Sequence, residues 1–218
     1  MISAKMLRAL AIPALLGLST LSQAALVLHT TQASFLSATS ATGVDTFTGL
    51  SISGTTPSPI TRSAGSYSYM AAVTTTTFFG AGTTANPWLS TNTAADSIIF
   101  SNFGGGAQAI GANFFTSNIL GAYAPGSIEI TAVDLNGTSS FTIDNTTINT
   151  FYGFVSTNTL ISLTVRSLQA ATPIWPTVDN LTIGLAADLP VDVPEPGNIA
   201  LLIAGLAAMA ALARRRRA

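Results

Sequence analysis

Two carboxylates, Glu129 and Asp144, flank an Asn-Gly pair and are predicted to face each other across a hairpin. If Leu135 pairs with Thr138, Glu129 lies opposite Asp144 with their Cβ atoms about 5 Å apart. Two acids at this distance suit three interpretations: solvated acids that splay apart, a calcium site, or a glycosidase pair. Solvated acids are the simplest interpretation. Calcium ranks above catalysis, because no substrate-distorting cleft is evident nearby.

A third acid, Asp179, precedes an alternating apolar run of Leu181, Ile183 and Leu185. It is in phase with that run, so it is predicted at the rim of the core face. An acid in such a place caps the N–H groups of a loop or binds an ion. A structural cap is the simpler interpretation, and a structural Ca²⁺ ion is the alternative.

The hairpin that positions the first two acids is predicted from Asn136-Gly137, a strong signal for a two-residue turn. In the predicted register Ala132 faces Phe141 and Ile130 faces Ile143, so the apolar pairs share one face. A slip by one residue would mix polar and apolar side chains. The alternation therefore supports the predicted register.

The rest of residues 25–188 is rich in Thr, Ser, Gly and β-branched residues, which favours strands. Strands are predicted at 44–52, 66–79, 97–101, 107–116, 127–134, 139–144, 151–156, 160–167 and 178–185. Loops are predicted at 53–66 and 83–92, and a short helix at 31–38 where Phe35 and Leu36 would dock. Short strands at this spacing indicate an all-β fold, a jelly-roll-like antiparallel β-sandwich.

One aromatic residue, Trp88 in a Pro-flanked predicted loop, is the candidate for stacking on a sugar ring. The other aromatic candidates are Trp175, Tyr67 and Tyr69. A tryptophan that fills the core is an equally simple interpretation of Trp88.

Catalytic motifs are missing from the sequence. It has a single histidine, His29, and no cysteine. It also contains no Gly-x-Ser-x-Gly elbow, phosphate-binding loop or His/Cys metal cluster. These absences favour a non-enzymatic protein. A purely structural matrix component remains open, as does an extracellular polysaccharide-acting enzyme that uses Glu129 and Asp144.

The charge of the body excludes another class of partner. Residues 25–193 hold two arginines and eight acids, a net charge of −6. Nucleic acid is excluded, because its binding depends on many cationic contacts to phosphate. Roughly 165 residues are enough for one domain with its own core, which needs no disulfides.

The first 24 residues have the pattern of a secretory signal peptide. Lys5 and Arg8 precede an apolar stretch from Ala9 to Leu18, and small residues end the segment at Ala24. Export by the Sec machinery and cleavage after Ala24 are expected, with an uncleaved signal anchor as the alternative.

The region after the body, from residue 189 onward, has three parts. A linker at 189–198 precedes an apolar run at 199–213 and a basic tail at 214–218. Fifteen residues span only about 22 Å as a helix, short of the roughly 30 Å hydrocarbon core. Arginine stems can make up part of the deficit. A transmembrane helix with a cytoplasmic tail is therefore expected.

Two short motifs in this region carry a family resemblance. The linker motif is Val193, Pro194, Glu195 and Pro196, and the basic cluster is Arg214, Arg215, Arg216 and Arg217. With the apolar run between them, they resemble the PEP-CTERM sorting signal. A plain tail anchor with a Pro-rich stalk is the alternative.

The resemblance implies recognition by exosortase, a membrane protease-transpeptidase of Gram-negative bacteria that make extracellular polysaccharide. It implies transient anchoring in the inner membrane, followed by delivery to the cell surface or to an extracellular matrix such as a biofilm. Within the exported domain, 25–188, residues 95–185 also resemble the β-sandwich bodies found ahead of such tails, in the hairpin, the Phe-Tyr-Gly-Phe segment at 151–154 and the final strand. These bodies look like carbohydrate-binding jelly rolls, some with a structural calcium ion held by an acid on the last strand, where Asp179 matches.

Overall fold

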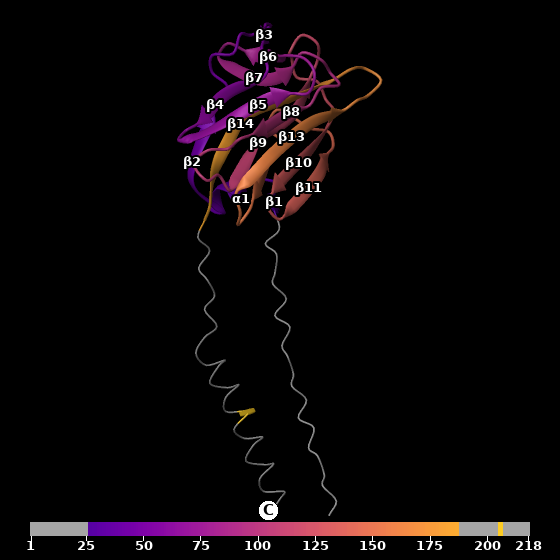
Figure 1. Cartoon of the computed structure of the whole chain (residues 1–218). Helices are drawn as coiled ribbons and strands as arrows, with labels where there is room; N and C mark the ends of the chain where they lie inside the picture. Colours follow the sequence, from indigo (N-terminus) through magenta and orange to yellow (C-terminus); the bar gives the residue numbers. More distant parts are fainter. Residues whose placement is uncertain (1–25, 188–204, 207–218) are drawn as a thin grey trace, which may run out of the picture.

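The computed structural model describes residues 26–187 and 205–206 (Figure 1). Fourteen strands and one short helix make up the described domain. One sheet, called sheet A here, contains β1 (Val27–His29), β2 (Thr39–Asp45), β3 (Thr55–Thr56), β6 (Phe78–Thr83), β7 (Asn86–Thr91), β9 (Ala109–Ser117), β12 (Phe151–Val155) and β14 (Trp175–Ala186). Its order is β1-β12-β9-β14-β7-β6-β3, and β2 also pairs with β14.

The second sheet, sheet B, contains β4 (Ile60–Ala64), β5 (Tyr67–Val73), β8 (Ile98–Ser101), β10 (Ser127–Asp134), β11 (Gly137–Ile143) and β13 (Leu160–Leu168). Its order is β11-β10-β13-β8-β5-β4. Strand pairing within both sheets is antiparallel. The predicted all-β antiparallel sandwich is confirmed.

Strands of both sheets alternate apolar and polar residues. The apolar faces of the two sheets pack against each other and form the core between them. On β10, Ile128, Ile130 and Ala132 are fully buried, whereas the residues between them are only half-buried. Phe114 and Phe154 of sheet A belong to the same core cluster. Each large apolar side chain buried there contributes about 1.5–3 kcal/mol of transfer free energy.

Several predicted strand boundaries differ from the structure. The predicted strand 66–79 is two strands, β5 and β6, because residues 74–77 turn the chain. Thr74, Thr75 and Thr76 hold this turn by donating their hydroxyls to the buried Asp96 carboxylate. The predicted strand 44–52 instead ends at Asp45, and Phe47 has a positive φ of 55°.

The two predicted loops also contain strands. Residues 53–66 include β3 and β4, and residues 83–92 include β7. These segments are rich in Thr and Ser, whose side chains fit a pleated surface once a partner strand is present. Pairing with β5 and β6 therefore overrides the local Pro and Gly signals.

The predicted short helix is present as α1 (Gln32–Ser37), which begins at the N-cap Thr31. The Thr31 hydroxyl accepts a hydrogen bond from the Ser34 amide at 3.2 Å. Phe35 is fully buried against Phe151, with ring centroids 5.5 Å apart, on the outer face of sheet A. Leu36 does not dock as predicted, since it is 43% exposed.

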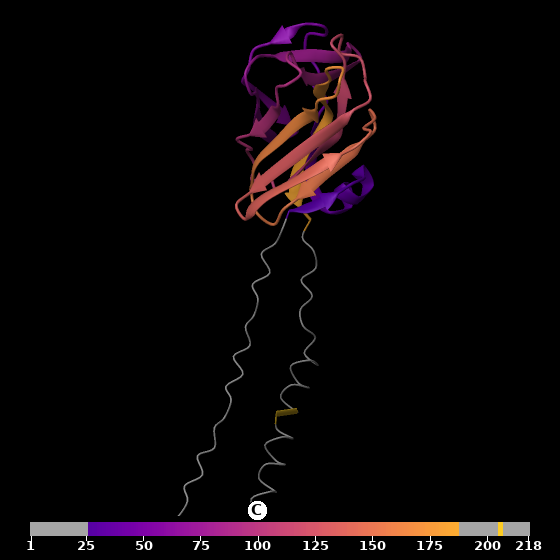
Figure 2. The ribbon, with the colours of Figure 1, turned by 90° about the vertical axis from the view of Figure 1, so that its right-hand side faces the viewer.

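Both ends of the described domain lie at one end of the sandwich (Figures 1 and 2). Val27, at the start of β1, pairs with Val155, Val155 pairs with Ala109, and Ala109 pairs with Gly184 near the end of β14. The first and last strands of the domain therefore reach the same end of sheet A. Trp175 starts β14 at the opposite end, roughly 36 Å away at 3.3 Å per residue.

The predicted signal peptide, linker motif and basic tail lie outside the described residues, as does the predicted membrane helix apart from Gly205 and Leu206. Within the described part of the chain, no helix is long and apolar enough to cross a membrane.

Candidate functional site

The β10–β11 hairpin has a register two residues away from the predicted one. Asp134 pairs with Gly137, so Glu129 lies opposite Thr142 and Ile130 opposite Phe141. The predicted pairing of Glu129 with Asp144 is wrong. A slip of two residues leaves every side chain on its original face, so the alternation could not separate the two registers.

The Asp134 side chain explains why the turn lies one residue earlier in the chain. Its Oδ1 accepts hydrogen bonds from the backbone amides of Asn136 at 2.7 Å and Gly137 at 2.9 Å. Its Oδ2 accepts one from the Ser156 hydroxyl. An Asp that bonds to the backbone two residues ahead stabilises a turn there, which makes Leu135 and Asn136 the turn residues.

The two hairpin acids have separate partners. Arg166 of β13 donates to Glu129 through Nε at 2.7 Å and Nη2 at 2.9 Å, and this hydrogen-bonded pair lowers the pKa of Glu129. Asp144, just after β11, accepts from the Ser127 hydroxyl at 2.9 Å. A glycosidase acid needs a raised pKa. The structure therefore lacks the opposed carboxylates on which both the hairpin calcium site and the glycosidase pair depended.

Asp179 lies on the outer face of sheet A, away from the core face predicted for it. A bulge after Asp179, where Asn180 has a positive φ of 54°, puts the acid out of phase with Leu181 and Ile183. Its side chain is nevertheless buried, because the residue is only 5% exposed. Burial raises the pKa of Asp179.

Among the described residues Asp179 belongs to no cluster of three acids or histidines, so backbone carbonyls, amide oxygens and water would have to supply most ligands of a calcium ion bound there. Its Oδ2 accepts hydrogen bonds from the amide nitrogens of Asn180 at 3.1 Å and Asn86 at 3.5 Å, and these groups are donors. Its Oδ1 is buried with no partner among the described residues. No three His, Asp or Glu side chains converge anywhere in that part of the chain, whereas calcium takes six to eight oxygen ligands.

Trp88 belongs to β7 and is not in a loop. Its half-buried ring packs edge-to-face on Phe115 of β9, with centroids 4.9 Å apart. Tyr67 and Tyr69 are buried in the core. Among the aromatic candidates, these contacts favour a packing role for Trp88, Tyr67 and Tyr69.

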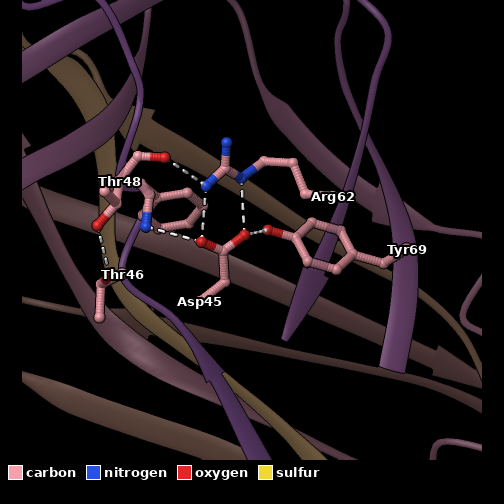
Figure 3. Close-up of polar contacts among 6 residues, drawn as sticks. Asp45, Thr46, Thr48, Arg62 and Tyr69 are labelled. Atoms are coloured by element: carbon pink, nitrogen blue, oxygen red, sulfur yellow. Dashed lines mark hydrogen bonds and ion pairs between the residues drawn. The ribbon is translucent and has the colours of Figure 1, made fainter. Parts of the chain in front are cut away.

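A buried ion pair joins β2 to β4 (Figure 3). Arg62 donates to Asp45 through Nε and Nη2, each at 2.7 Å, and the Tyr69 hydroxyl and Phe47 amide donate to the same carboxylate at 2.7 Å. Burial alone would raise the pKa of Asp45, but these four hydrogen bonds and the Arg62 charge lower it. Every oxygen is paired, so this cluster serves stability.

The fourth aromatic candidate, Trp175, lines a shallow pocket of about 150 Å³ on the outer face of sheet A. The pocket lies where β6, β7 and the end of β9 meet the start of β14. Its lining residues are Phe79, Ser90, Thr91, Asn92, Asn118, Ile119 and Trp175. Of these seven residues, only Trp175 is a candidate from the sequence, because no motif joins the others along the chain.

Hydrogen bonds fix the floor and one wall of this pocket. The Thr177 hydroxyl lies 2.9 Å from that of Ser117 and 3.2 Å from that of Ser90, close enough to donate to one of them, and the three form a buried cluster of hydroxyls. In the wall, the Asn118 Oδ1 accepts from the amides of Leu120 at 2.9 Å and Ala122 at 3.1 Å. The Asn118 side-chain NH₂ is thus left to donate. The pocket therefore combines aromatic side chains with amide groups.

Comparisons with known proteins give no family for this chain. No protein-family model matches it, and a search of curated proteins finds no match. Its function is therefore argued from the site and from the sequence motifs.

Proposed function

We propose that this protein is an exported, PEP-CTERM-type surface or matrix protein whose jelly-roll-like β-sandwich binds extracellular polysaccharide without acting on it as an enzyme. The pocket at Trp175 carries the glycan-binding part of the proposal. Sugar rings present C–H faces that pack on aromatic rings, and their hydroxyls bond to amides such as Asn92 and Asn118.

The position of the pocket supports this function. Trp175 and Ala186 lie at opposite ends of β14, so an anchor attached after this strand leaves the pocket on the far side of the domain. A domain held at a membrane during sorting would then present its pocket outward. After cleavage of the anchor, the released domain would keep the pocket accessible to polysaccharide.

The sorting part of the proposal depends on the sequence. Its elements are the signal peptide, the motif Val193–Pro196, the apolar run 199–213 and the cluster Arg214–Arg217. The proposed partners are the Sec export machinery, an exosortase-like membrane protease and the polysaccharide itself. The proposed route is export, transient anchoring in the inner membrane of a Gram-negative bacterium, and transfer to the surface or matrix.

Replacing Trp175 by alanine tests the pocket. Loss of a stacked aromatic anchor costs about 2 kcal/mol, so the affinity for a bound oligosaccharide should fall roughly thirtyfold. Isothermal titration of the full chain in detergent, against neutral and acidic oligosaccharides, measures this change. Trp175→Phe should retain most of the affinity.

Ile161→Ala is the matched control, because Ile161 is 46% exposed on β13 of sheet B, away from the pocket. It should bind like the wild type. Equal affinity of Trp175→Ala and wild type for every ligand that binds would contradict the assignment of this pocket.

Calcium is retained as a proposal at Asp179 alone. In calcium-free buffer at pH 7, Asp179→Asn should raise the melting temperature, because it removes a buried charge whose Oδ1 has no partner. A raised pKa means that ionisation at neutral pH costs folding free energy, and this cost disappears as pH falls below the folded pKa.

Thermal melts with calcium and with chelator complete this test. Millimolar calcium should raise the melting temperature of the wild type more than equal magnesium does, and should leave Asp179→Asn unchanged. If calcium left the melting temperature of the wild type unchanged, the proposed calcium ion at Asp179 would be contradicted. Destabilisation by Asp179→Asn in calcium-free buffer would refute the unpaired-charge argument.

A further inference from the structure

The seven side chains that line the Trp175 pocket are all uncharged. Two are aromatic, one is aliphatic, two carry hydroxyls and two carry amides. Proteins that bind carboxylate or sulfate groups typically use arginine or lysine for charge-assisted hydrogen bonds. The pocket wall supplies none of these groups, so it provides no charged partner for an acidic sugar.

The cations of the domain are already paired elsewhere. Between residues 26 and 187 the sequence has two basic residues other than histidine, Arg62 and Arg166. Arg62 is bound to Asp45, and Arg166 to Glu129 of sheet B. Six acids lie in the same range, which gives a net charge of −4. A negative domain repels polyanions at low ionic strength.

The polar groups of the pocket match sugar hydroxyls. The Asn118 Oδ1 fixes its own loop, and its NH₂ has no partner among the described residues, while the exposed Asn92 supplies a second amide. The buried Ser90 and Thr91 hydroxyls donate to the carbonyls of Pro176 and Thr93, so they support the pocket wall. Ile119, which is 72% exposed, and Trp175 offer apolar surface for the C–H face of a ring. Hydroxyls can both donate and accept, so an uncharged sugar leaves few polar groups unpaired.

We propose that the Trp175 pocket selects uncharged hexose units and rejects polysaccharides made of uronic acids or sulfated sugars. The inference rests on the proposed glycan-binding function and narrows its ligand class. Selectivity arises because an acidic group would lose water without gaining a cation and would approach a negative domain.

Paired oligosaccharides that differ only in charge test the selectivity. The probes are hexamers of glucose, galactose and mannose, hexamers of the three corresponding uronic acids, and the same uronic acids with methyl-esterified carboxyls. Titration calorimetry of the full chain in detergent at pH 7 and low salt measures each affinity. For at least one sugar type, the neutral or esterified hexamer should bind at least ten times as tightly as the corresponding acidic hexamer. Added salt should reduce this difference in affinity.

A cation placed in the pocket provides the second arm. Asn92→Arg should raise the affinity for the acidic hexamer of that sugar and reduce the selectivity at least fivefold. Ile161→Arg adds the same charge on sheet B and should leave the selectivity within twofold of the wild type.

The possible failures are distinguishable. Acidic hexamers that bind as tightly as neutral ones overturn the selectivity but leave glycan binding intact. Binding of no probe overturns the proposed glycan-binding function, and this inference with it. An equal effect of Ile161→Arg and Asn92→Arg would show that net charge, and not this pocket, sets the selectivity.

Discussion

Replacing Arg62 by methionine is expected to lower the free energy of unfolding by about 3–5 kcal/mol, because it leaves the Asp45 carboxylate buried without its cation. Asp45 keeps hydrogen bonds from the Tyr69 hydroxyl and the Phe47 amide, but neither supplies a charge. Arg62 also lies over the Phe47 ring, with its guanidinium carbon 5.5 Å from the centroid. Urea unfolding of the full chain at pH 7, followed by circular dichroism, measures the loss.

The second ion pair of the domain provides a matched control. Arg166→Met removes an equally short contact to Glu129, but the Arg166 side chain is 50% exposed. Exposed pairs contribute about 0–1 kcal/mol. Equal losses for Arg62→Met and Arg166→Met would contradict the assignment of Asp45 as a buried, cation-dependent acid.

The same cluster sets part of the acid sensitivity. The folded pKa of Asp45 is lowered, so its stabilisation is complete above the ordinary aspartate pKa of about 4. That stabilisation is lost as pH falls from there through the lowered folded value. Arg62→Met should reduce this loss, because burial then opposes ionisation of Asp45 with fewer compensating contacts.

Deletion of Pro194 to Pro196 is expected to keep the protein in the inner membrane with the tail Arg214–Arg217 attached. The motif is the proposed recognition element for the sorting protease, so its loss should block cleavage. Membrane fractionation with a tag in the exported domain measures the distribution. Nearly all of the variant should sediment with the inner membrane, whereas the wild type should leave it.

Deletion of residues 190–192 shortens the linker by the same length and spares the motif, so this control should be processed like the wild type. If the Pro194–Pro196 deletion variant left the inner membrane at the wild-type rate, this result would contradict the proposal that the motif directs sorting.

The hairpin shows what the sequence could and could not predict. Alternation of Ile128, Ile130 and Ala132 correctly assigns the buried face of β10. The register depends instead on Asp134 bonding to the turn amides, a contact that is absent from the alternation pattern. A two-residue shift therefore preserved the faces and yet misplaced the acids.

Asp179 and Trp88 show two other limits of the sequence. The phase of Asp179 changes at a single bulged residue, Asn180, and no apolar pattern announces that change. Pro87 predicts a loop around Trp88, yet Pro87 pairs with Gly82 in the β6–β7 hairpin. At Trp88 strand pairing overrides the local proline signal, and at Asp179 a bulge interrupts the alternation of the strand.

The pocket could not be predicted because its lining comes from separated parts of the chain. Phe79, Ser90, Asn118 and Trp175 meet only when β6, β7, β9 and β14 assemble in sheet A. Such long-range strand neighbours are fixed by the topology, which periodicity alone does not specify.

The intact mass of the mature protein, isolated from the surface or matrix of the producing cells, tests the central claim most directly. That claim is an exported domain delivered by cleavage at both ends. The predicted mass lacks residues 1–24 and the apolar run with its arginine tail, 199–218. A mature species that still carries Arg214 to Arg217 would contradict the proposed processing.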